Sequence, residues 1–132
     1  MTPAAALLRA TGLSQSEAAE WLGVRLDSVR GWCRDGGSRL PPGVRDQLHT
    51  LAQRQRRAAD ETLAAITRAP AAAEIEIGYA SDDAEAQAMG WPCRAAQWQS
   101  LALVYASAAR TVRLVPRGST LATAAAADAH GL

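Results

Sequence analysis

The chain contains no lysine, so all 14 of its basic side chains are arginines. The planar guanidinium group of arginine suits phosphate groups and guanine edges. The formal net charge is nevertheless only +1. That charge is too low for a protein that coats nucleic acid non-specifically through its phosphates. Bulk charge therefore disfavours a nucleoid-type binder and leaves selective binding of nucleic acid open.

Other signals are also missing from the sequence. The only cysteines, Cys33 and Cys93, lack metal-ligand spacing, which predicts reduced thiols in the cytoplasm. We find neither a signal peptide after Met1 nor an apolar window of transmembrane length, so we expect no membrane partner. His49 and His130 lie far apart, and no phosphate-binding glycine loop or nucleophile motif occurs. We therefore expect no catalysis, no metal and no cofactor.

Length and composition allow one domain or two very small ones in 132 residues. Hydrophobic residues make up 48% of the chain, but many are alanines, which bury little area each, so such a chain gains from dimerising. Residues 1–69 carry a net charge of +3 and residues 70–132 one of −2. Pro70 and the alanines after it mark the expected domain boundary.

The most informative stretch is residues 14–36, SQSEAAEWLGVRLDSVRGWCRDG, which predicts two short helices joined by a glycine turn. Ser14 and Glu17 have the spacing of a capping box, and Gly23 supplies the turn. Small or apolar side chains occupy the positions that a helix-turn-helix requires. Counted from Gln15 as the first position, they are Ala19 (fifth), Gly23 (ninth), Val24 (tenth), Val29 (fifteenth) and Trp32 (eighteenth).

Helices are also expected around this motif. Thr2 and Pro3 predict a first helix that ends before Gly12. The spacing of apolar residues over 43–69 predicts one long helix with a single apolar stripe. In residues 70–116, alternating segments at 74–79 and 111–116 predict two strands around two helices. Two strands are too few for a stable sheet, so pairing with a second copy is expected. The fold class is mainly α: an N-terminal helix-turn-helix bundle with a long fourth helix, plus a small β-α-α-β dimerisation unit and a disordered tail at 117–132.

The pattern SQSEAAEWLGV…VRGW…G resembles the Cro/C1-type (XRE) helix-turn-helix regulators. The continuation, with Leu40-Pro41 before the long helix and GW…Q…LALVY later, is similar to YdiL-like regulators and anti-CRISPR-associated (Aca-type) repressors. Arg25 stands where those families usually have a Ser or Thr cap. The resemblance implies a homodimeric repressor that binds an inverted repeat near its own promoter, with the second motif helix in the major groove.

Carried over by position, the resemblance implies base contacts from the second motif helix. The candidates are Arg25, Asp27, Ser28, Arg30 and Arg34. Arg30 is the side chain expected on a guanine edge. Backbone contacts are expected at the amino end of the first motif helix and beyond the second. These candidates are Gln15, Ser16, Arg39 and Arg45.

Alternatives remain open at this stage. Asp27 could pair with Arg30 or Arg25 instead of a base, and any of the arginines could simply face solvent. The three-helix unit could be a protein-interaction module, and RNA is not excluded as a partner. The main expectation is an autoregulatory, cytoplasmic, sequence-specific DNA-binding repressor. The alternative is an antitoxin-like helix-turn-helix module whose C-terminal region binds a partner protein.

Overall fold

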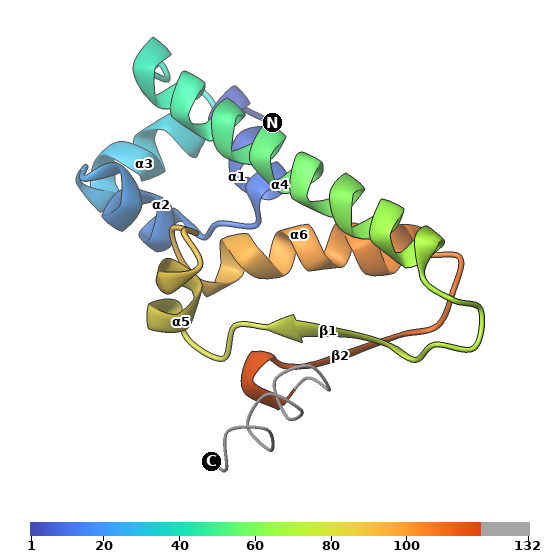
Figure 1. Cartoon of the computed structure of the whole chain (residues 1–132). Coiled ribbons are helices and arrows are strands. Elements are labelled where there is room, and N and C mark those ends of the chain that lie inside the picture. The colour runs from blue at the N-terminus through green and yellow to red at the C-terminus, as the bar shows by residue number, and fades with distance from the viewer. Residues whose placement is uncertain (120–132) are drawn as a thin grey trace. The chain divides into compact units, whose positions relative to one another are not determined.

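The computed structural model describes residues 1–119 and is mainly helical (Figure 1). The elements, in chain order, are α1 (Pro3–Thr11), α2 (Gln15–Leu22), α3 (Leu26–Cys33), α4 (Pro42–Arg68), β1 (Ile75–Tyr79), α5 (Asp83–Ala88), α6 (Arg94–Ser107), β2 (Val112–Pro116) and the short 3-10 helix η1 (Arg117–Ser119). A mainly α chain with a long helix and a small sheet is therefore confirmed. Within residues 1–119, none of the helices has the length and apolar character needed to span a membrane.

The chain divides into two compact units, and the division lies within α4. The first unit is Met1–Arg57, and the second begins at Ala58. The boundary expected from sequence, at Pro70, instead follows the end of α4. The 27 residues of α4 serve both units because its two halves belong to different cores.

The first unit is a helical core around α3. Thr2 caps α1 by accepting a hydrogen bond from Ala5 N at 3.2 Å. Gln55, on α4, is 1% exposed, and its Nε2 donates to Thr11 O at 2.8 Å. This bond ties α4 to the carboxyl end of α1. The buried apolar residues of this unit are Ala4, Leu8, Leu13, Ala18, Ala19, Val29, Trp32, Leu48 and Leu51.

The second unit contains the two expected strands, which pair in parallel with Ile75 opposite Val112 and Tyr79 opposite Pro116. A parallel pair needs a long crossover connection, and α5 with α6 provides it. The two helices expected between the strands are present as α5 and α6. Arg117–Ser119, at the start of the expected tail, form η1, and residues 120–132 lie outside the described part of the chain.

One apolar cluster of the second unit joins α4, α6 and both strands. It is formed by Ala59 and Ile66 from α4, Val104 from α6 and Val112 from β2, with Ile77 of β1 packed against them. Arg110, between α6 and β2, is bound to the end of α4. Its guanidinium donates to the carbonyls of Ile66 and Ala69 at 2.9 Å and of Pro70 at 2.8 Å. One side chain thus satisfies several carbonyls at the end of a helix.

Candidate nucleic-acid interface

Local hydrogen bonds determine where α2 begins and ends. Ser14 Oγ accepts from Glu17 N at 3.0 Å, and Glu17 Oε1 accepts from Ser14 N at 2.9 Å. Gly23 ends the helix with φ of 67°, a left-handed conformation that favours glycine. Val24 N then donates to Ala19 O at 3.1 Å, closing the turn. The capping box and the glycine turn expected from the sequence are both present.

Helix α3 has a buried face and an exposed one. Val29 is 1% exposed and Trp32 is 9% exposed, and the helix packs against α1 and α2. Arg25, Asp27 and Arg30 are exposed, whereas Ser28 is half-buried. Arg25 occupies the N-cap position without a side-chain capping bond. Four of the candidate base-contacting residues therefore belong to α3 or its cap, and three of these four are freely accessible.

Arg30 forms an ion pair on the surface of α3. Its Nη1 lies 3.4 Å from Asp27 Oδ1, and the two side chains are 59% and 77% exposed. This is one of the pairings considered as an alternative to a base contact. An exposed pair of this kind contributes only about 0–1 kcal/mol, so a stronger partner could displace it. Arg30 therefore lies on the exposed face of α3 and can exchange Asp27 for a stronger partner.

The fifth candidate, Arg34, does not lie on the helix. It is the C-cap residue of α3, with extended backbone angles of φ −83° and ψ 132°. The change in backbone direction brings it together with Arg39 and Arg45. These three arginines line a surface cavity of about 320 Å³, which we call the arginine hollow; Thr2 and Ser38 also line it. The structure therefore places Arg34 with the expected backbone-contacting arginines.

A close backbone approach shapes the arginine hollow. Gly37 N donates to Arg34 O at 2.9 Å. A Cβ atom at position 37 would collide with the backbone oxygen of Gly31 and would lie 2.9 Å from Arg34 O. Only glycine permits this packing, because backbone atoms cannot move aside as a flexible side chain can. The turn after α3 thus packs directly against the backbone at the end of α3.

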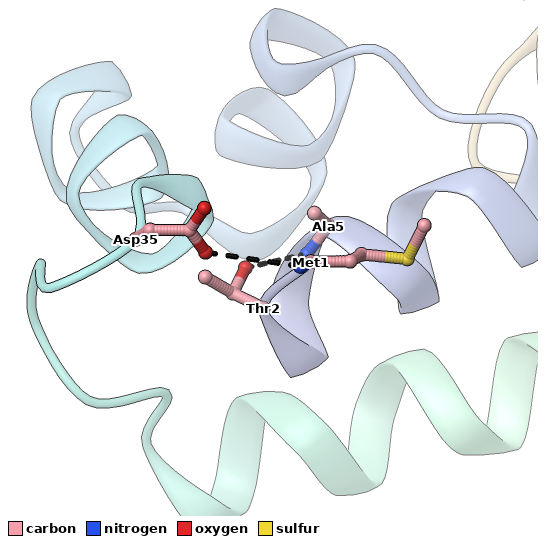
Figure 2. A network of polar contacts seen from close by, with 4 residues as sticks. All are labelled: Met1, Thr2, Ala5 and Asp35. Carbon is pink, nitrogen blue, oxygen red and sulfur yellow. Dashed lines mark hydrogen bonds and ion pairs between the residues drawn. The ribbon is translucent and has the colours of Figure 1, made fainter.

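The start of the chain contributes to the same region (Figure 2). The Met1 ammonium group lies 3.8 Å from Asp35 Oδ1, and Thr2 Oγ1 accepts the capping bond from Ala5 N. Thr2 also lines the arginine hollow. The Asp35 carboxylate, which adjoins Arg34 in sequence, is thus within ion-pair distance of the Met1 ammonium.

The charge of the hollow is largely uncompensated. Within residues 1–119, neither Arg34 nor Arg39 makes a side-chain hydrogen bond or ion pair. Arg45 lies 3.6 Å from Asp46, and both side chains are more than half exposed. Available guanidinium groups form short, charge-assisted hydrogen bonds with phosphate oxygens. The hollow is therefore suited to an anionic ligand.

Gln15 and Ser16 are exposed at the amino end of α2. The Gln15 side chain forms a hydrogen bond with the Cys33 thiol, at the end of α3. Burial raises the pKa of Cys33 above its usual value, although the Gln15 bond acts in the opposite direction. Gln15 therefore links the two helices and is not simply available to a ligand, whereas Ser16 is.

Sequence reasoning missed the parts of the hollow that carry no charge. Thr2 entered only the prediction of the first helix, and neither Gly37 nor Ser38 was a candidate. The available signal was the pair of glycines between Arg34 and Arg39, because glycine permits the tight turn that can bring two nearby side chains together. Comparison with known protein families, curated proteins and solved structures finds no match to this chain.

Proposed function

We propose that this protein is a sequence-specific DNA-binding transcriptional repressor that acts as a homodimer on an inverted-repeat operator. The arginine hollow carries this proposal, because it presents uncompensated guanidinium groups on the same compact unit as the exposed face of α3. Phosphates position a protein on DNA, whereas base edges give specificity. The first unit offers groups for both tasks.

In the proposed complex, α2 and α3 act as a helix-turn-helix. The exposed face of α3 enters the major groove, where Arg30 leaves Asp27 and donates to a guanine edge. Arg34, Arg39 and Arg45 hold a backbone phosphate beside the groove. Ser16, at the amino end of α2, contacts a second phosphate with the help of the helix dipole.

Repression would follow from occupation of a promoter, where the bound dimer occludes RNA polymerase. A two-fold symmetric dimer reads a palindrome whose half-sites lie about 34 Å apart, or a multiple of that distance. The resemblance described above suggests that the operator lies upstream of the protein's own gene, which makes the repressor autoregulatory.

Fluorescence anisotropy with labelled duplexes from the upstream region tests the proposal. We expect Arg30→Ala to reduce discrimination between operator and unrelated DNA by about 1–3 kcal/mol. Arg39→Ala should weaken binding to both duplexes alike and lower the slope of log affinity against log salt by about 1. Arg56→Ala is the matched control, because Arg56 is an exposed arginine of the same unit that does not line the hollow.

Two results would contradict the proposal. One is a wild-type protein that binds no upstream duplex at any salt concentration. The other is a set of three variants that weaken binding equally, since this would mean that the arginines act only through total charge. An RNA duplex of the operator sequence, added as competitor, tests whether the interface accepts RNA.

A second candidate function has support from the second unit. Trp98 and Tyr105 on α6 are 42% and 59% exposed, which fits an antitoxin-like module that binds a partner protein. The two candidates differ in the oligomeric state of the free protein. A monomer in solution would favour the antitoxin-like module, whereas a dimer favours the operator-binding repressor.

A further inference from the structure

The arginine hollow has an apolar wall as well as a charged one. Pro3, Trp32 and Leu40 form this apolar wall beside the three arginines. Trp32 is only 9% exposed, so the hollow reaches a side chain of the core. Small-molecule sites combine a mostly apolar concave surface with a few polar groups, and their volumes begin at about 300 Å³. The hollow, at about 320 Å³, therefore has the size and the mixed lining of a site for a small organic anion.

The charged wall carries more positive charge than one DNA phosphate can neutralise. Arg34, Arg39 and Arg45 line the hollow, and none of the lining residues in the described part of the chain is acidic. Each phosphodiester of DNA has one negative charge. A phosphate monoester has a charge of about −1.5 to −2 at pH 7 and three acceptor oxygens. The three guanidinium groups therefore match a monoester better than they match the DNA backbone.

The three arginines come from different points of the chain. Arg34 is the C-cap of α3, Arg39 follows in the turn, and Arg45 is in the first turn of α4. Guanidinium groups from separate backbone positions can approach the oxygens of a tetrahedral phosphate from different sides. A planar carboxylate, in contrast, is already matched by a single guanidinium fork. The arrangement thus favours a phosphate over a carboxylate.

Neutral donors add to the same site. Thr2 Oγ1 accepts a hydrogen bond from Ala5 N at 3.2 Å, which leaves the hydroxyl hydrogen of Thr2 available to a ligand. The Ser38 hydroxyl also lines the hollow and belongs to an exposed residue. Thr2 is the N-cap of α1, so the positive end of that helix dipole lies at the hollow and favours an anion there.

We propose that the arginine hollow binds a small organic phosphate monoester, and that this ligand competes with operator DNA. The phosphate group lies against Arg34, Arg39 and Arg45, and the organic part packs against the apolar wall. The competition rests on the proposed function, because the same arginines hold a backbone phosphate in the DNA complex. A bound ligand occupies them, and phosphate contacts carry no sequence information, so every DNA sequence is bound more weakly. The ligand is therefore an inducer that relieves repression.

Calorimetric titration of the full chain at constant ionic strength tests the site. Phenyl phosphate, a monoester with an aromatic body, should bind with one molecule per chain. Methyl phenyl phosphate has the same ring but is a diester with one charge, so it should bind at least about tenfold more weakly. Inorganic phosphate should also bind more weakly than phenyl phosphate, because it leaves the apolar wall uncovered. Malonate tests whether a dicarboxylate is accepted instead.

Variants show whether the hollow is the place of binding. Arg39→Ala should weaken the binding of phenyl phosphate at least about tenfold, because it removes charged hydrogen bonds. Arg39→Lys keeps the charge but loses the planar fork, so it should recover only part of the affinity. Arg56→Ala is the matched control and should bind like the wild type, since Arg56 is an exposed arginine of the same unit outside the hollow. Circular dichroism confirms that each variant is folded.

Four results would overturn the site. The first is the absence of phenyl phosphate binding up to about 10 mM, the weak end of specific affinities. The second is equal affinity for phenyl phosphate and its methyl diester, and the third is tighter binding of malonate than of phenyl phosphate. The fourth is an equal loss of affinity in Arg39→Ala and Arg56→Ala, which would mean that only total charge matters.

Fluorescence anisotropy with labelled operator DNA tests the competition. Phenyl phosphate at about ten times its dissociation constant should raise the apparent dissociation constant of the DNA about tenfold. Methyl phenyl phosphate at the same ionic strength should leave it unchanged, which separates competition from salt screening. DNA binding that is unaffected by saturating phenyl phosphate would overturn the competition.

The failure of this inference can be distinguished from the failure of the proposed function. A protein that binds operator DNA but no phenyl phosphate would overturn the ligand site and keep the repressor. A protein that binds phenyl phosphate in the hollow but no DNA would keep the ligand site and remove the proposed function.

Discussion

The two units of this protein use their surfaces in different ways. In residues 1–57 the only large apolar side chain that is strongly exposed is Met1, and the surface carries the arginine hollow. In the second unit, Trp98, Leu103, Tyr105 and Leu114 are exposed. A surface with free guanidinium groups suits a phosphate-rich polymer, whereas a surface with exposed aromatic and aliphatic groups suits a protein. Under the functions proposed above, the first surface would contact DNA and the second a protein.

The units also differ in what stabilises them. The first unit depends on close helix packing, with Val29 and Leu48 each 1% exposed and Gly37 pressed against α3. The second unit adds to its apolar core the hydrogen bonds of Arg110 to the carboxyl end of α4. We therefore test close packing at Gly37 in the first unit and the hydrogen bonds of Arg110 in the second.

The largest effect is expected from Gly37→Ala. The new Cβ atom collides with backbone oxygen, so the turn must move away from α3, at a cost of about 3 kcal/mol. Hydrogen exchange should show loss of protection in α1–α3, with α6 and the strands retaining theirs. Gly43→Ala is the control, because a Cβ atom there meets nothing within 4 Å and the position is helical. Equal loss of protection in both units would contradict their separation.

A smaller effect is expected in the second unit from Arg110→Ala. It removes charge-assisted bonds to carbonyls at the end of α4 and should lower the free energy of unfolding by about 2 kcal/mol, measured by chemical denaturation. Arg110→Lys should recover part of this loss, because a single ammonium cannot reach all the carbonyls. The comparison between the units fails if Arg110→Ala costs nothing while β1 and β2 keep full protection.

The smallest effect is expected from Ser14→Ala, which removes one half of the capping box. The cost should be about 1 kcal/mol and should be confined to α2 and α3. Ser16→Ala, two residues further on and exposed, serves as control and should change the free energy of unfolding by less than about 0.5 kcal/mol. Equal costs for the two substitutions would show that the capping bond contributes nothing.

Much of the fold could be predicted because its signals are local. The caps at Thr2 and Ser14 each depend on a donor three residues away, and the structure contains both bonds. The spacing of apolar residues, which predicts helices and strands, also depends only on residues close together in the sequence. The structure places α3 and the two strands at the expected segments, with ends that differ by one or two residues.

Other features could not be predicted because they depend on distant residues. The pairing of the strands in parallel follows from how α5 and α6 return the chain, which no strand pattern encodes. Arg110 reaches carbonyls about 40 positions earlier in the chain. The position of Arg34 was misjudged for the same reason: helical spacing continues the α3 face through it, whereas the packing of Gly37 turns the backbone away.

By itself the sequence determined the short-range features of this protein. These are the capping box, the Gly23 turn, and the buried and exposed faces of α3. These depend on the steric and hydrogen-bonding properties of residues within one or two helical turns. Only the tertiary structure decided which arginines meet at the hollow and which apolar groups stay exposed around Trp98. Both depend on contacts between segments far apart in the chain, and burial and proximity exist only once those segments have packed.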